Sequence, residues 1–212
     1  MYFSKKDIEN LSRVKRLNII NSITGIKPGN LIGTKSLEGH TNLAIFSSVV
    51  HLGSHPALIG FFLRPSTKIR RDTYENILET GSYTINHIDK RIIEKAHYSS
   101  VKFSSYVSEF EKLKLTEQYI NDFYAPYLLE SKIKIGLSFV EEVDVKINGT
   151  KLIIGEIRHI YLPENIMSEE GYLNLEKSAS VGIGGLNSYY NLNFNAEFPY
   201  ARIENLPNFD ED

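Results

Sequence analysis

The sequence predicts a mainly β protein, a closed antiparallel barrel with short helices around it. Apolar runs bounded by turn residues outnumber helical patterns, and they do not alternate with helices as a parallel sheet requires. Aromatic residues make up 11% of the chain, and flat rings favour strands. The pair Asn148-Gly149 stands between two long β-rich runs, which is a strong hairpin signal.

The 212 residues have the composition of a globular protein, with 42% hydrophobic residues and a formal charge of −2. We expect one domain over residues 1–212. The charge gives no support to nucleic-acid binding, and the longest apolar run, at 57–63, is too short to span a membrane. No signal peptide is visible, so we expect a cytoplasmic location.

The chain contains no cysteine, which excludes disulfides, thiolate metal sites and cysteine nucleophiles. His51 and His55 are four residues apart, but Gly53 and Pro56 argue against the helix that would place them together. We therefore expect no metal site.

The first third of the chain predicts one helix and several strands. Ser4 and Asp7 precede apolar residues three apart, which indicates a helix over 4–14. Residues 17–26 are predicted as a strand closed by the turn at 27–29, and residues 30–34 as a second strand. Residues 41–50 alternate as a strand, and the apolar run 57–63 indicates a strand that is buried on both faces.

The middle of the chain predicts short helices around another strand. Asp72 and Gly81 bracket a helix over 72–79, and residues 82–88 alternate as a strand. Asp89 can cap a second helix, and Ser108 can open a third.

Two long strands, over 133–147 and 151–162, flank the Asn148-Gly149 turn. The glycines at 182–185 lack the spacing of a dinucleotide-binding loop and are predicted as a turn before Tyr189 and Tyr190. The acidic tail after residue 206 is expected to be frayed.

One polar cluster indicates chemistry. Arg64, Lys68, Arg70 and Arg71 form a basic loop that runs into the start of the helix at 72, where guanidinium groups and free N–H groups suit a phosphate. A solvated loop is the alternative interpretation. With the hydroxyls of Ser47-Ser48 on the preceding strand, the loop could surround a phosphorylated, largely aromatic ligand.

Several stretches, in this order, resemble the flavin reductase-like family of FMN-binding split barrels. They are NLIGT (30–34), GHTNLAIFSSVVHLGSHPALIGFFLRP (39–65), RDTYENILETGSYTIN (71–86), AHYSS (96–100) with VKF just after it, SEFE (108–111) and NGTKLIIGEIRHIYLPE (148–164). No single stretch is specific, but the ordered set covers more than half of the chain.

The resemblance implies a six-stranded antiparallel split barrel with peripheral short helices, a homodimer, and noncovalently bound FMN near the subunit interface. It also implies the parts of the cofactor site: a strand that lies along the flavin, a residue that anchors the phosphate, a second polar wall, and aromatic residues that cover the ring or the interface. The corresponding cofactor-binding residues are Asn42, Leu43, Phe46, Ser47 and Ser48 on the strand, Arg64 as anchor, His97, Ser99, Ser100 and Lys102 in the wall, and Tyr190, with Tyr189, in the cover.

The implied function is an FMN-dependent oxidoreductase that uses NADH or NADPH to reduce flavin or another acceptor. An FMN electron carrier of the flavoredoxin type, served by a redox partner protein, is one alternative, and a non-redox split-barrel binding protein is another. No catalytic dyad or triad is visible, which fits a protein whose cofactor carries the chemistry. The segment with Tyr189, Tyr190, Phe194 and Phe198 is predicted to cover part of a dimer interface, unless these rings close the monomer's own core.

Overall fold

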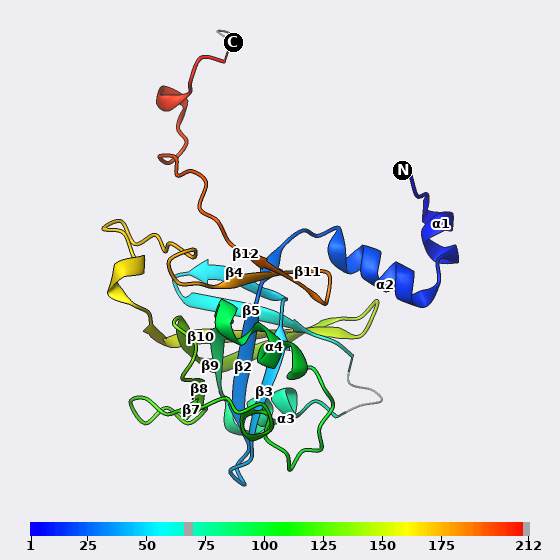
Figure 1. Ribbon diagram of the computed structural model, residues 1–212, viewed down its shortest axis with the longest axis vertical. Coiled ribbons are helices and arrows are strands. Elements are labelled where there is room, and N and C mark those ends of the chain that lie inside the picture. Colours follow the sequence, from blue (N-terminus) through cyan, green and yellow to red (C-terminus); the bar gives the residue numbers. More distant parts are fainter. Residues whose placement is uncertain (66–69, 210–212) are drawn as a thin grey trace.

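A computed structural model describes residues 1–65 and 70–209 (Figure 1). Its main sheet has seven antiparallel strands in the order β3-β2-β6-β9-β10-β5-β4. These strands are β2 (Asn30–Lys35), β3 (Thr41–Phe46), β4 (Val49–Ser54), β5 (Ala57–Leu63), β6 (Ser82–His87), β9 (Lys134–Val145) and β10 (Thr150–Tyr161).

Smaller elements surround this sheet. A second sheet contains β1 (Lys27–Pro28), β11 (Val181–Gly184) and β12 (Ser188–Asn191), and β7 (Glu117–Gln118) pairs with β8 (Tyr127–Leu128). The α-helices are α1 (Lys5–Asn10), α2 (Arg13–Ser22), α3 (Asp72–Thr80), α4 (Ile93–Tyr98) and α5 (Glu109–Lys112). Three short 3-10 helices lie at Lys90–Ile92, Glu164–Ile166 and Ile203–Asn205. The predicted mainly β fold with peripheral short helices is confirmed.

The two edges of the main sheet belong to one continuous segment. β3 and β4 are the edge strands, and only Ser47-Ser48 separates them along the chain. The Ser48 hydroxyl donates to the carbonyl of Phe62 (2.9 Å) and accepts from the N–H of Phe62 (3.2 Å). The strand predicted over 41–50 is therefore interrupted at the serines. The sheet has seven strands rather than six, because this bent segment contributes two.

Two apolar clusters lie on opposite sides of β3. Leu43 and Ile45 pack into a cluster with Ile92, Ala96 and other residues around α4 and α5. Phe46 packs into the second cluster, against Phe61, with α3 at its side. The strand is thus held from both faces, which fixes the direction of its polar side chains.

The strand predicted over 17–26 is wrong. Residues 13–22 form α2, whose start is capped by Ser12, because its Oγ accepts from the N–H of Lys15 (3.4 Å). The helix predicted over 4–14 is shorter and ends at Asn10, where Leu11 is extended. Isoleucines three and four residues apart fit the period of a helix. Because no described strand pairs with this segment, it folds as a helix.

The helix that follows the basic loop begins differently from the prediction. Asp72 is the first helical residue of α3 rather than its cap, and its carboxylate accepts from Nε of Arg70 (2.8 Å). Gly81 ends the helix as predicted, with a φ of 65° that favours glycine. Asp89 does cap the next helical turn, since its Oδ1 accepts from the N–H of Arg91 (2.9 Å).

Three further expectations need correction. Ser108 precedes α5, but its side chain does not cap the helix. β5 is not buried on both faces, because Phe62 is exposed. Gly182 and Gly184 lie within β11, and the turn to β12 begins at Gly185, whose φ is 61°.

We expect His87 to make the protein less stable in acid. It lies at the end of β6 with Nδ1 3.1 Å from the Ser180 hydroxyl, and burial lowers the pKa of His87 to about 4. Between about pH 6.5 and 4 the unfolded chain therefore binds a proton that the folded chain does not. The contribution of His87 to the free energy of unfolding is complete above about pH 6.5 and is lost on acidification. The loss is about 3 kcal/mol by pH 4. Urea unfolding of wild type and His87→Gln across this range checks it, and parallel stability curves would contradict it.

Candidate functional site

Two contacts connect β3 and its bend to neighbouring segments. At the start of the strand, the Asn42 amide donates to the hydroxyls of Thr73 (2.9 Å) and Thr34 (3.3 Å). Thr73 belongs to the first turn of α3, so the amide joins the strand to the helix start. At the bend, Ser48 holds the backbone of Phe62, two residues before Arg64. The fold therefore connects Asn42 and Ser48 with the two ends of the basic loop.

The start of α3 has the properties of an anion-binding site. Among the described residues, no side chain caps this helix, whose first N–H groups point out of its end. Arg71 immediately precedes the helix, and its Nε is buried without a hydrogen-bond partner in the part of the chain that the structure describes. An orphaned guanidinium N–H beside an uncapped helix start fits the phosphate of FMN.

In the sequence, Arg71 belongs to the basic loop, but it was not among the predicted site residues. The sequence feature that could have identified Arg71 was the density of basic residues just before the helix. Arg64, the predicted anchor, follows β5 and is exposed. Lys68 lies outside the described residues.

The open edge of β3 is held by Glu109, a residue that the sequence did not single out for the site. One carboxylate oxygen of Glu109 accepts from the backbone N–H of Leu43 (2.9 Å). Burial raises the pKa of Glu109, and the hydrogen bond from Leu43 opposes this effect. The side chain of Leu43, a predicted site residue, is fully buried in the core and is not available to a ligand. In the sequence, the Ser-Glu-Phe-Glu pattern at 108–111, which contains Glu109, predicted only the start of a helix.

The predicted polar wall lies on α4, which packs beside β3. Nδ1 of His97 is 3.1 Å from the hydroxyl of Tyr189, and the two rings meet edge to face. The hydroxyls of Ser99 and Ser100 donate to the carbonyls of Ala96 and His97, both at 2.8 Å, so they satisfy the end of their own helix.

The remaining predicted site residues occupy three different places. Phe46 lies edge to face with Phe61 at 4.9 Å between ring centroids, and Ser47 is half-buried at the bend. Lys102 is exposed beyond α4. Tyr190 is exposed on β12, and its ring lies so close to Gly184 that a Cβ there would be 2.6 Å from Cε2. No described contact links Tyr190 to β3.

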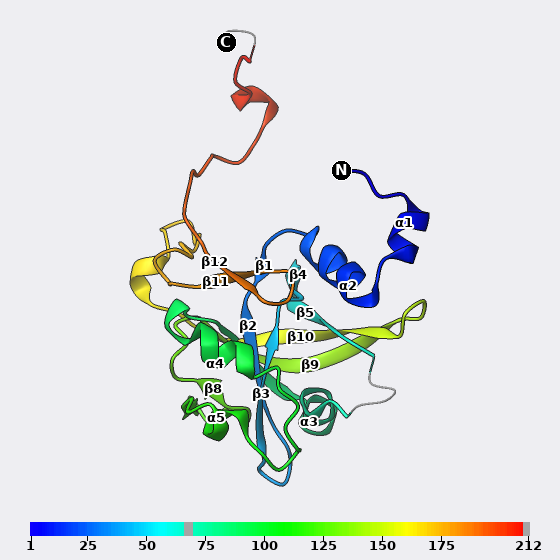
Figure 2. The ribbon, with the colours of Figure 1, turned by 45° about the vertical axis from the view of Figure 1, so that its right-hand side comes forward.

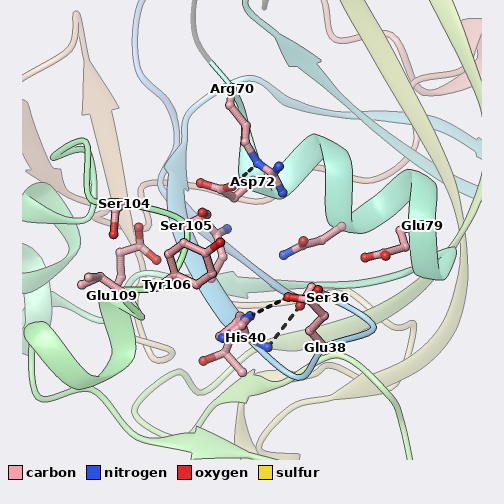
Figure 3. A pocket seen from close by; sticks show the side chains of 14 residues that line it. Ser36, Glu38, His40, Arg70, Asp72, Glu79, Ser104, Ser105, Tyr106 and Glu109 are labelled. Atoms are coloured by element: carbon pink, nitrogen blue, oxygen red, sulfur yellow. Dashed lines mark hydrogen bonds and ion pairs between the residues drawn. The ribbon is translucent and has the colours of Figure 1, made fainter.

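A pocket of about 210 Å³ opens at the start of β3, between α3 and the loop before α5 (Figure 3). Figure 3 shows Arg70 and Asp72 at the beginning of α3 and Glu79 at its far end. The residues that line it are Ser36, Glu38, His40, Thr41, Asn42, Arg70, Asp72, Asn76, Glu79, Ser104, Ser105, Tyr106, Val107 and Glu109.

This pocket accounts for only part of a cofactor site. Cofactor pockets have about 300–1,000 Å³, so the pocket is too small for a whole FMN. Four of its lining residues are carboxylates, and only Arg70 supplies a guanidinium. The acidic lining of this pocket therefore disfavours a phosphate there.

Two negative findings concern residues 1–65 and 70–209. No group of three or more His, Asp or Glu side chains is placed to hold a metal ion. No helix in these ranges combines the length and the apolar composition needed to cross a membrane.

The barrel, with its polar edge strand beside a helix start that no described side chain caps, is the architecture of the split-barrel flavoproteins. The family model described as "Flavin reductase like domain" matches residues 27–180. The chain therefore belongs to the flavin reductase-like family.

Solved structures agree with this membership. A protein of Shewanella frigidimarina NCIMB 400, assigned as a flavin reductase with a split barrel domain, is 44% identical, with a TM-score of 0.91 over 95% of this chain and 100% of that one. Nitrilotriacetate monooxygenase component B from Bacillus cereus is 17% identical (TM-score 0.81, 93% and 98% covered). Flavoredoxin of Desulfovibrio vulgaris (Miyazaki F) is 22% identical (TM-score 0.71, 83% and 92% covered). The last two similarities show the fold alone.

Proposed function

We propose that the chain binds FMN noncovalently and acts as an oxidoreductase that uses NADH or NADPH to reduce flavin or another acceptor. One observation carries this proposal: among the described residues, the buried Nε of Arg71 has no hydrogen-bond partner and no side chain caps the adjacent start of α3, which is joined to β3 through Asn42 and Thr73. Membership of the flavin reductase-like family supports it.

Each group of residues has its own task in this proposal. Arg71, Arg64 and the first N–H groups of α3 hold the phosphate. β3, fastened by Glu109 and Ser48, gives the flavin ring a rigid edge, with Ser47 at the bend. His97 and the α4 end form the second polar wall. Bound FMN supplies the hydride and electron transfer, so these residues need only bind and orient it.

The oligomeric state is part of the proposal. Because the pocket is smaller than FMN, a homodimer in which the partner chain completes the site explains where the remaining contacts come from. We propose a cytoplasmic location for this dimer.

We expect the purified protein to be yellow, or to quench the fluorescence of added FMN at micromolar concentration. Visible spectra recorded before and after addition of NADH, and separately of NADPH, then test the reaction. The expected results are bleaching of the flavin absorbance when oxygen is excluded and steady consumption of nicotinamide in air, where oxygen reoxidises the flavin. A colourless protein that leaves FMN fluorescence unchanged would refute the proposed function.

An FMN electron carrier of the flavoredoxin type is the second candidate, because a flavoredoxin shares this fold. Such a carrier binds FMN equally well but consumes little NADH or NADPH and accepts electrons from a redox partner protein. Steady-state nicotinamide oxidation therefore separates the two. A non-redox binding protein would show neither flavin binding nor nicotinamide oxidation.

A further inference from the structure

Helix α2 carries an apolar row with no cover of its own. None of its residues, all of which the structure describes, is buried. Val14, Leu17, Ile20 and Ile23 recur every third position, and each exposes between 43% and 71% of its surface. We call these four residues the α2 row. A monomer rarely leaves several large apolar side chains together in water without a partner.

A second uncovered apolar segment follows β12. Residues 193–209, which we call the aromatic tail, leave the barrel in a mostly extended path with one 3-10 turn (Figures 1 and 2). Its large apolar side chains expose between 54% and 92% of their surface: Phe194, Phe198, Tyr200, Ile203, Leu206 and Phe209. The alternative that Phe194 and Phe198 close the monomer's own core is therefore wrong, whereas Tyr189 does pack on that core.

The accessible surface is too large for a compact monomer. A folded monomer of 24.2 kDa exposes about 10,000 Å² on average, whereas this chain exposes 13,874 Å². The excess of about 3,900 Å² per chain exceeds what each partner contributes to an obligate dimer, whose interfaces bury about 2,000–5,000 Å² in total.

The charges of the two segments are complementary. α2 carries Arg13, Lys15 and Arg16 and has no acidic residue. The aromatic tail contains Glu197, Glu204 and Arg202, and three further carboxylates follow it in the sequence at 210–212. Contact between the segments therefore brings opposite charges together around an apolar centre.

We propose that the aromatic tail of one copy of this chain docks on the α2 row of a second copy, and reciprocally. Both segments leave the barrel at the end where β11 and β12 lie, yet they diverge from there, and each remains exposed in its own chain (Figures 1 and 2). A second copy supplies the missing cover twice in one closed two-fold dimer. This interface is inferred without use of the proposed function, because neither segment contains a residue assigned to flavin binding.

Cross-linking tests the exchange in the full-length protein. Because the chain has no cysteine, Ile20→Cys and Phe198→Cys introduce unique thiols at exposed positions. When the two variants are co-expressed and treated with a short bismaleimide, a covalent dimer is expected that is at least tenfold more abundant than with either variant alone. No excess over the single variants overturns the proposal. An internal cross-link in the Ile20→Cys/Phe198→Cys double variant, with none between co-expressed chains, also overturns it.

Light scattering gives an independent readout. Ile20→Glu places a carboxylate opposite an acidic tail, so the dissociation constant of the dimer is expected to rise at least tenfold. Ile147→Glu, at an exposed position in the β9–β10 turn, is the matched control and leaves the mass unchanged. Equal masses for both variants at every concentration overturn the proposal.

Discussion

Arg64→Ala is expected to weaken FMN binding about tenfold to a hundredfold and to leave riboflavin binding nearly unchanged. Arg64 stands at one end of the basic loop, and Ser48 fixes the end of β5 just before it. A hydrogen bond between a guanidinium and a phosphate contributes about 1.5–3 kcal/mol to the binding free energy. Riboflavin has no phosphate and therefore does not make this bond. Fluorescence titration with both ligands measures the two dissociation constants.

Arg158→Ala is the matched control for this experiment. Arg158 is a partly exposed arginine on β10 that pairs with Glu156 (2.9 Å), away from the loop, and its removal should change neither constant. If Arg64→Ala weakens both ligands equally, the phosphate is bound elsewhere. Arg71, which is already assigned to the phosphate, is then its main anchor, and Arg70 and Lys102 are the next residues to test.

Gly33→Ala is expected to destabilise the fold by about 3 kcal/mol, because β2 has no room for a methyl group there. A Cβ on Gly33 would lie 2.4 Å from the carbonyl oxygen of Pro126 and 2.7 Å from the hydroxyl of Thr84. These two atoms already form a buried hydrogen bond of 2.7 Å, so neither can give way without breaking it. The melting temperature should fall by about 6–12 °C, measured by thermal unfolding.

Gly53→Ala provides the comparison, since both residues are strand glycines. Its added Cβ would approach only the carbonyl oxygen of Pro56, at 3.4 Å. We expect a change in melting temperature close to zero. Equal effects of the two substitutions would show that general strand propensity, rather than crowding at Gly33, decides the outcome.

The sequence predicted best those elements that local chemistry defines. The β9–β10 hairpin follows from Asn148-Gly149, and the end of α3 follows from Gly81, because a positive φ needs glycine. Residues 17–26 were predicted wrongly because isoleucines suit strands, while their spacing also fits a helix. The segment forms a helix because Ser12 caps its start and no described strand pairs with it.

The candidate site shows a similar division. The polar strand, the basic loop and the following helix were visible in the sequence, since they are close in the chain. The role of Glu109 was not, because it bonds to a backbone group 66 residues away. Whether Arg71 finds a partner likewise depends on how distant segments pack around it, which no local pattern encodes.

The bent segment from β3 to β4 has a mechanical consequence. Because one stretch of chain forms both edges of the sheet, the two halves of the barrel cannot spread apart without bending at Ser47-Ser48. Such a hinge motion would carry Asn42 with it, and through the amide contact also Thr73 at the start of α3. A change in the distance between the edge strands β3 and β4 would thus also shift the start of α3, where we propose that a ligand binds.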